Sequence, residues 1–490
     1  MTNNILLLTI NDKKNLYAST ESLSAIQPNI GMGLLDSYLE SKGIAVEMID
    51  ETSNYSIAEI IDIIETEQPV LFGVICSGAN PSASTMSMVG AIKFFKELGD
   101  RKGQSNGFIQ GGHPSVLPKR TLEETGADYL IRGEGYKTIE QLYRSLISGE
   151  EYPNIEGLAY IKDGEYIGTN FPKLIDVKEL PMVNWEKMNP NKYRAHNWHS
   201  FGGIKHRSPY GVIWTSLGCP HNCSFCCTNN VFGQRTYRMR DMQEVLKEID
   251  VLVLQYGVKN IKILDELFVI NHPRIEEFYQ GLKQRKYDLN MWCYARTDSV
   301  TPEILKKLRE VGVKWIAYGI ESTNQKVLGD IGKGCSRDFY DSVIKITKDA
   351  GMYFGIDIIT GLWLDNFETM EETYQWCVGH NFEWLNMYPA FALPGTKLYD
   401  DCIKDGRRET PKDWSEYSLY GYNCFPLNSK YLTREQILEW RDNKFLEYYS
   451  RPEYLDMMEN KFGLETRNHI VTMANHRLPR RILEGVTYEI

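Results

Sequence analysis

The stretch CPHNCSFC, residues 219 to 226, places three cysteines at a C-x₃-C-x₂-C spacing within one short loop. An apolar, strand-like run from Val212 to Thr215 precedes it, and a helical pattern follows it. Three thiolates can hold three corners of a cubic iron–sulfur cluster, for which four cysteines are the usual complement. The fourth iron is then open to a substrate or cofactor, and an open metal position is typical of a catalytic site.

A structural zinc site is the main alternative for these cysteines. Zinc normally takes four ligands, usually from two separated pairs, and the chain has no second C-x₂-C pair. His221 and Cys227 are close by, but they lie too near Cys219 or Cys226 in sequence to complete a relaxed tetrahedron. The spacing and the strand–loop–helix context therefore favour a cluster over zinc.

The length and composition are those of a folded protein with several domains. A chain of 490 residues is too long for one core and suggests two or three domains. The apolar fraction of 42% and the charged fraction of 24% are ordinary. The net charge of −10 argues against a broad nucleic-acid surface, so we expect no nucleic-acid partner.

Segments for export and for membrane insertion are not expected. No apolar run approaches the ~18 residues of a membrane span. The N-terminus, MTNNILLLTINDKK, has an apolar stretch too short for a signal peptide and no basic flank before it. Ten cysteines in this length are not the density of a disulfide scaffold. We therefore expect a reducing, cytoplasmic location.

Residues 1–150 alternate short apolar runs with helical patterns, which predicts a parallel, doubly wound, Rossmann-like sheet. Ligands of such sheets lie at the carboxyl ends of the strands, near the switch point. The expected strands are Ile5–Thr9, Ala45–Ile49, Val70–Cys76, Gly107–Gln110 and Asp128–Ile131, and the expected helices are Gly31–Lys42, Ile57–Glu65, Met86–Leu98 and Thr121–Thr125.

Small residues gather after three successive strands of this region. Glycine there allows a backbone to approach a large ligand closely. Each group alone would suit a tight turn, but their repetition at strand ends favours a ligand site. The candidate cofactor contacts are Ser77, Gly78, Gly111, Gly112, Gly133, Glu134 and Gly135.

From Val212 the alternation resumes and predicts a partial (β/α)₆ barrel, whose active site would lie at the carboxyl ends of its strands. The expected strands are Val212–Ser216, Ile261–Leu264, Met291–Tyr294, Lys314–Tyr318, Tyr353–Ile359 and Trp384–Met387. Polar residues follow them. Glu321 and Ser322 are the first candidates for cofactor contacts, and Asp265 and Arg296 come next; a buried ion network of Arg296, Asp298 and Glu321 is the alternative.

TSLGCPHNCSFCC, residues 215–227, resembles the cluster loop of the radical S-adenosylmethionine superfamily, with Phe225 before the last ligand. The resemblance implies that Cys219, Cys223 and Cys226 ligate a [4Fe-4S] cluster, whose open iron binds the methionine moiety of S-adenosylmethionine. Cys227 is not expected to be a ligand. The family usually has P-G-E-T where this chain has WLDNFET, residues 363–369, and a second Asp where it has Glu266.

PNIGMGLLDSYLESKG, GGHPSV and GADYLIRGEGY, taken in order, resemble the cobalamin-binding domain fused to many of these enzymes. The resemblance implies cobalamin as a cofactor. The D-x-H-x-x-G motif that supplies a cobalt-ligating histidine in cobalamin mutases is absent, and His113 is in the wrong place for that role. The dinucleotide pattern G-x-G-x-x-G is also absent after the first strand, which disfavours a nicotinamide cofactor.

Four regions are therefore expected: a cobalamin-binding domain (1–150), a hairpin and linker (151–208), a radical S-adenosylmethionine barrel (209–400) and a mainly helical C-terminal region (401–490). Asp163-Gly164 predicts the hairpin, and Thr433 to Gln436 form a capping box for a C-terminal helix. No small β-barrel pattern appears, and the first domain has one cysteine rather than three. Both observations disfavour a methylthiotransferase.

The expected activity is methylation of an unactivated carbon through a 5′-deoxyadenosyl radical and methylcobalamin. The expected partners are a small-molecule substrate (a natural product, lipid or sugar) and an electron donor such as flavodoxin or ferredoxin. One alternative keeps both cofactors for ring formation, rearrangement or electron transfer. A non-catalytic redox sensor is the alternative from another class. Nothing at the barrel mouth selects among the substrates.

Overall fold

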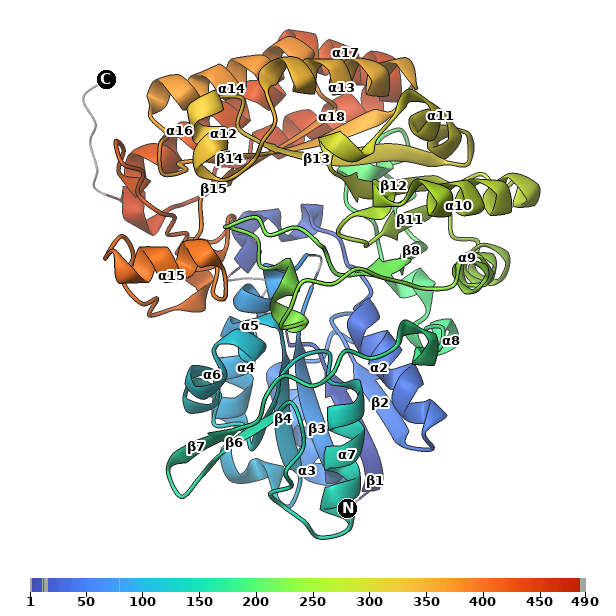
Figure 1. Ribbon diagram of the computed structural model, residues 1–490, viewed down its shortest axis with the longest axis vertical. Coiled ribbons are helices and arrows are strands. Elements are labelled where there is room, and N and C mark those ends of the chain that lie inside the picture. Colours follow the sequence, from blue (N-terminus) through green and yellow to red (C-terminus); the bar gives the residue numbers. More distant parts are fainter. Residues whose placement is uncertain (1, 11, 13–15, 79, 485–490) are drawn as a thin grey trace.

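The computed structural model describes residues 2–10, 12, 16–78 and 80–484. Two α/β units follow one another along the chain, and C-terminal helices pack on the second unit (Figure 1). In Figure 1 the N-terminal unit occupies the lower half and the six-stranded unit the upper half. This confirms the predicted fold class, a Rossmann-like sheet followed by a partial (β/α)₆ barrel and a helical extension.

The first sheet has the strand order β2-β1-β3-β4-β5-β6-β7. Strands β1 to β5 are parallel, and the reversal of strand order between β1 and β3 creates a switch point. The hairpin predicted at Asp163-Gly164 is present and adds β6 and β7 as antiparallel strands. The strands are β1 (Thr2–Leu8), β2 (Ala45–Ile49), β3 (Pro69–Cys76), β4 (Asn106–Gly111), β5 (Tyr129–Ile131), β6 (Leu158–Lys162) and β7 (Glu165–Gly168).

Alternating side chains of the first sheet enter two separate cores. Ile5 and Leu7 of β1 pack with the helices α2 and α7, whereas Leu6 and Leu8 pack with α3 and α4. Successive residues of a strand point to opposite faces, so a strand that is apolar at every position needs helices on both sides. The helices are α2 (Ile30–Ser41), α3 (Ile57–Glu67), α4 (Ala83–Leu98), α5 (Gly112–Val116), α6 (Pro118–Thr125) and α7 (Tyr136–Ile147).

The second sheet is parallel throughout, with the order β15-β14-β13-β12-β11-β8. Its strands are β8 (Tyr210–Ile213), β11 (Asn260–Ile263), β12 (Asn290–Ala295), β13 (Val313–Glu321), β14 (Tyr353–Thr360) and β15 (Trp384–Pro389). Its helices are α9 (Met242–Tyr256), α10 (His272–Arg285), α11 (Pro302–Glu310), α12 (Gln325–Asp330), α13 (Arg337–Asp349) and α14 (Phe367–His380). The first strand is shorter than predicted: the chain leaves β8 after Ile213, and β9 (Ser216–Leu217) pairs instead with β10 (Arg238–Met239).

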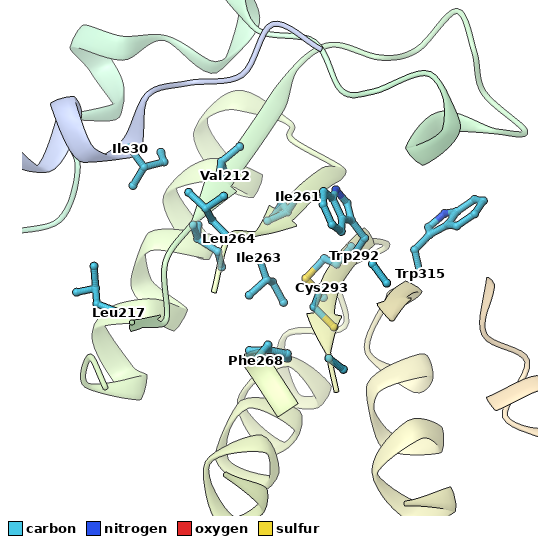
Figure 2. Packing of buried hydrophobic residues seen from close by; sticks show 14 of the residues in the cluster. Ile30, Val212, Leu217, Ile261, Ile263, Leu264, Phe268, Trp292, Cys293 and Trp315 are labelled. Atoms are coloured by element: carbon cyan, nitrogen blue, oxygen red, sulfur yellow. The ribbon is translucent and has the colours of Figure 1, made fainter. Parts of the chain in front are cut away.

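Aromatic rings close the barrel at the amino ends of its strands. Trp198, from the linker, lies with its ring centroid 4.9 Å from Trp292, 5.6 Å from Trp315 and 6.1 Å from Trp384. Figure 2 shows Trp292 and Trp315 beside the buried aliphatic residues of β8 and β11. Large rings therefore fill this end of the barrel.

The C-terminal region comprises α15 (Lys397–Lys404), α16 (Arg434–Ser450), α17 (Pro452–Phe462) and α18 (Leu464–Ala474). The predicted capping box of Thr433 and Gln436 is present at the start of α16. Phe462 stacks on Trp315 with centroids 5.8 Å apart, so the tail covers the aromatic end of the barrel. Throughout the described residues, every helix is too short or too polar to cross a bilayer.

Candidate functional site

A cavity that opens to solvent lies between the two α/β units, and the space within it and its mouth is about 990 Å³. One wall comes from the loops after β1, β3, β4 and β5, at the switch point of the first sheet. The other wall comes from the segments after β8 and β11 and from the residues that follow the cysteine loop. The carboxyl ends of both sheets therefore face one shared space, where ligands of both fold types bind.

The first wall contains five of the seven predicted contacts, Ser77, Gly78, Gly111, Gly112 and Glu134. Asn29, which we did not single out from the sequence, joins them. Its side-chain oxygen accepts hydrogen bonds from the Ser77 hydroxyl (3.0 Å) and the Met32 backbone N–H (3.1 Å). The asparagine is the N-cap of α2 and so fixes the loop that enters the cavity.

The protein's own backbone, without any ligand, requires glycine at several positions of this wall. A Cβ on Gly111 would lie 2.3 Å from the Cys76 carbonyl oxygen, and its φ is +153°. A Cβ on Gly112, by contrast, would lie 3.6 Å from its nearest neighbour. Gly133 and Gly135 also have positive φ angles and line a smaller hollow beside Pro172 and Phe232. Their contact with a cofactor stays a prediction.

Glu134 forms a salt bridge with Arg238 of the second α/β unit. Its carboxylate accepts two hydrogen bonds from the Arg238 guanidinium, at 2.7 and 3.0 Å, and one from the Ile175 backbone N–H at 3.2 Å. Both side chains are largely buried, with 9% of Glu134 and 16% of Arg238 exposed. Glu134 thus ties the first domain to β10 at the edge of the cavity.

The three predicted ligands differ from every other cysteine of the chain. Cys219 and Cys223 are partly accessible and Cys226 is exposed, whereas the other seven cysteines are buried. All ten are free thiols. Three accessible, unbridged thiols on one loop are the donor set that a [4Fe-4S] cluster with one open iron requires, so these residues fit the group in type and in their spacing along the loop.

The thiols are not arranged as a finished metal site. Among the described residues, no set of three or more His, Cys, Asp or Glu side chains has the arrangement that a metal ion needs. The Cys226 sulfur lies 3.1 Å from the Thr228 hydroxyl. Because metal ligands must be thiolates, loading the loop would release protons and rearrange the side chains.

Asp265 and Glu266 follow β11 but have different surroundings. Asp265 is fully buried and accepts hydrogen bonds from the Thr215 N–H (2.6 Å), the Thr215 hydroxyl (2.6 Å) and the Ser216 hydroxyl (2.5 Å). It therefore holds the segment that leads into the cysteine loop. Glu266 lines the shared cavity and accepts a hydrogen bond from Thr228 at 3.3 Å, and burial raises its pKa to about 7.

The remaining predicted contacts lie at the ends of β12 and β13, outside the lining of the shared cavity. Arg296 forms two hydrogen bonds with Asp298, at 2.9 and 2.7 Å. Glu321 has a φ of +64° and pairs with Lys333 at 3.1 Å. The Ser322 hydroxyl lies 3.2 Å from that of Thr373. The Arg296–Asp298 pair matches part of the ion network that was the alternative to cofactor binding, whereas Glu321 pairs with Lys333 instead. The cofactor roles of these residues stay predictions.

His113 lies outside the shared cavity, packed edge-on against Trp414 with ring centroids 4.3 Å apart. Its Nδ1 is 3.2 Å from the Thr85 hydroxyl, and its Nε2 is buried without a hydrogen-bond partner in the described chain. Burial, followed by the charge of Arg120, lowers the pKa of this imidazole to about 3. Such a ring is a neutral packing group.

This burial predicts a pH dependence of stability. Between pH 6.5 and 3 the unfolded chain binds a proton at His113 that the folded chain does not, so stability falls as the pH drops. Going from pH 6.5 to 5 should cost about 1 to 2 kcal/mol through this residue. Chemical denaturation of wild type and His113→Gln at both pH values measures it. Equal losses in the two proteins would contradict the assignment.

Family models match both units of the chain. The Radical SAM superfamily matches residues 215–377, and the B12 binding domain matches residues 20–143. These ranges contain the cysteine loop with most of the barrel and most of the first sheet, respectively.

Curated relatives cover much of the same length. An uncharacterized methyltransferase of Pyrococcus horikoshii is 27% identical over 87% of this chain and 89% of its own. An anaerobic magnesium-protoporphyrin IX monomethyl ester cyclase of Rubrivivax gelatinosus is 25% identical over 83% of this chain and 71% of its own. A putative methylthiotransferase of Methanocaldococcus jannaschii is 31% identical over 65% and 67%.

A solved structure shares the whole arrangement of the two units. The radical S-adenosylmethionine methyltransferase TsrM from Kitasatospora setae, with cobalamin and a [4Fe-4S] cluster bound, matches with a TM-score of 0.69. The match covers 92% of this chain and 90% of that one at 15% identity. At this identity the likeness supports the fold.

Proposed function

This chain belongs to the radical S-adenosylmethionine enzymes that carry a cobalamin-binding domain, and from this premise we propose that it methylates an unactivated carbon of a small molecule. The observation that carries the proposal is the shared cavity. Its walls combine the switch point of the first sheet with Cys227 and Thr228, which directly follow the cluster loop. A methyl carrier and a radical initiator would thus act on one enclosed substrate.

The protein's part is to hold both cofactors and to keep water away. The bound cluster with S-adenosylmethionine supplies a 5′-deoxyadenosyl radical, and methylcobalamin supplies the methyl group. Cys219, Cys223 and Cys226 would hold the cluster, and Asp265 anchors the segment that carries them. Trp214, Leu217 and Phe232 make part of the cavity wall apolar, which excludes water.

The cofactor contacts within this proposal are the residues predicted from the sequence. Ser77, Gly78, Gly111 and Gly112 would face cobalamin from the first wall. Glu321 and Ser322 would face the ribose of S-adenosylmethionine, and Arg296 its carboxylate, because charged and hydroxyl groups at a strand end suit those functions. A flavodoxin or ferredoxin would deliver the electron. The cytoplasmic location stays a prediction.

Ring formation is the second candidate. The Rubrivivax cyclase favours it, because that relative matches 83% of this chain. It would use the same two cofactors and the same cavity. The non-catalytic sensor is set aside, because the chain belongs to a family of enzymes and has the accessible cysteines and the shared cavity of one.

Anaerobic reconstitution tests the proposal. Protein supplied with iron, sulfide, cobalamin and a reductant is expected to retain cobalt and to convert S-adenosylmethionine into both 5′-deoxyadenosine and S-adenosylhomocysteine. The second product reports methyl transfer to the carrier. 5′-Deoxyadenosine without S-adenosylhomocysteine would favour ring formation, and the absence of both products would contradict an enzymatic role of the cluster.

A further inference from the structure

The inner face of the barrel changes from large aromatic residues at the amino ends of the strands to small and polar residues further along them. Because side chains alternate along a strand, the residues that share a face with Trp292, Trp315 and Trp384 also face the lumen. The strand register places Tyr294, Ala317, Gly355 and Trp384 in one row. The next row contains Gly319, Asp357 and Asn386.

The glycines beside Asp357 differ in the space around them. A Cβ on Gly355 would lie at ordinary contact distance, 3.4 Å, from the Cβ of Ala317, whereas one on Gly319 would lie 2.4 Å from the Glu321 carboxylate. Asp357, Tyr294, Asn386 and Tyr388 retain partial solvent access from their inward-facing positions. This access leaves Asp357 reachable from the lumen.

Asp357 is held in place on one side and free on the other. The Asn386 side-chain N–H donates to one carboxylate oxygen at 2.7 Å, and Trp384 Nε1 fixes the Asn386 oxygen at 2.8 Å. The second oxygen has no hydrogen bond within the described residues. No described cation lies within ion-pair distance of Asp357. Burial raises the pKa of Asp357 to about 7, and the charge of the nearby Lys333, which pairs with Glu321 at 3.1 Å, opposes that rise.

Three tyrosines complete this site. Tyr294 and Tyr388 come from β12 and β15, and Tyr420 comes from the C-terminal region, where its ring stacks on Tyr17 at 6.1 Å. In the described part of the chain, their hydroxyls form no hydrogen bond. Burial and then the charge of Asp357 raise the pKa of Tyr294 and of Tyr388, so the carboxylate is electrostatically close to both phenols.

We propose that Asp357, with Tyr294, Tyr388 and Tyr420, binds a protonated amine of the methyl acceptor; this proposal rests on the proposed function. A carboxylate that lacks a partner in a low-dielectric site is costly, and a ligand cation removes that cost. The faces of Tyr388 and Tyr420 attract the same charge, whereas the ring of Tyr294 already has the Lys262 ammonium 5.6 Å from its centroid. A neutral analogue would leave Asp357 unpaired, so the site would select amines over alcohols of equal shape.

The test uses 2-phenylethylamine and 2-phenylethanol. They share one carbon skeleton, and the amine carries a charged ammonium where the alcohol carries a neutral hydroxyl. Ligand-observed NMR titrations of the reconstituted protein at pH 7.5 measure both affinities. We expect wild type to prefer the amine by about 10-fold, equivalent to about 1.4 kcal/mol. Asp357→Asn should bring the preference below about 2-fold, and Tyr388→Leu should reduce it to an intermediate value.

The controls separate this site from the cofactor and from the overall function. Asp330→Asn changes an exposed carboxylate of α12 and should keep the full preference. S-adenosylmethionine affinity is measured in the same proteins, and a parallel loss in Asp357→Asn would overturn the proposal by placing the carboxylate at the cofactor. Equal binding of the two probes by wild type, or binding of neither, would also overturn it. The titrations measure binding without turnover, so a failure of the proposed methyl transfer would not change the amine preference and the two outcomes can be told apart.

Discussion

The Cys223→Ala variant is expected to lose its cluster and to form 5′-deoxyadenosine at least on the order of 100-fold more slowly than wild type. Mutating a residue that only supports a metal ligand already lowers metal affinity or activity by about 10- to 100-fold, and Cys223 is a predicted ligand itself. Cys223 is the central cysteine of the loop and is one of three accessible thiols. The nearest cysteine outside the three predicted ligands, Cys227, is buried and lines the cavity. Iron and sulfide content after anaerobic reconstitution measure the first loss, and product formation measures the second.

Cys227→Ala is the matched control, because it removes a thiol adjacent to the loop without removing a predicted ligand. Burial raises the pKa of Cys227 well above its ordinary value, so this thiol is a poor source of thiolate. We expect full iron content and near wild-type product formation. A Cys223→Ala protein that still cleaves S-adenosylmethionine, or a Cys227→Ala protein that loses its iron, would disprove the ligand assignment.

The fold could be predicted because its signal is local and repeated. Each parallel strand is an apolar run bounded by turn residues, and each helix has its own periodicity and cap. These patterns located the strands of both sheets to within a few residues, as at Ala45–Ile49, which β2 matches at both ends. The exit of β8 after Ile213 was missed, because the run from Val212 to Ser216 is continuous in sequence and turns only to pair with β10.

The side-chain directions at strand ends could not be predicted. Asp265 and Glu266 are adjacent acidic residues, and the sequence-based prediction chose Asp265 as the cofactor contact, whereas Glu266 is the one that lines the cavity. Their positions were decided by Thr215 and Ser216, fifty residues earlier, which supply three hydrogen bonds to Asp265. Glu266 then faces the cavity.

The lumen site was invisible in the sequence for a similar reason. Asp357 lies within an apolar strand, where it resembles an isolated polar residue. Its meaning depends on the register that brings Asn386 beside it and on Tyr420, which arrives from beyond the barrel. Neither relation has a local pattern. The motifs therefore predicted where the cofactors bind, and the three-dimensional packing was needed to propose a site for the substrate.

Glu134 shows the same limit, and it leads to the second large prediction. Its position in Gly133-Glu134-Gly135 suggested a cofactor contact, whereas its partner is Arg238, 104 residues later. Arg238→Ala would leave the Glu134 carboxylate buried and unpaired. Breaking such a pair by removing one partner typically costs about 3 to 5 kcal/mol. Because the pair joins the two units, we expect the destabilisation at their interface and weaker retention of cobalamin.

Chemical denaturation and hydrogen exchange measure this effect, with faster exchange expected in the loop before α7 and in β10. Lys137→Ala is the control, since Lys137 lies three residues after Glu134, at the start of α7, and the change removes an exposed ion pair with Glu179 that should be worth less than about 0.5 kcal/mol. The double variant Glu134→Gln/Arg238→Ala should be more stable than Arg238→Ala alone, because it no longer buries an unpaired charge. If Arg238→Ala were no more harmful than Lys137→Ala, the pair would be a surface contact and Glu134 would again be available to the cofactor.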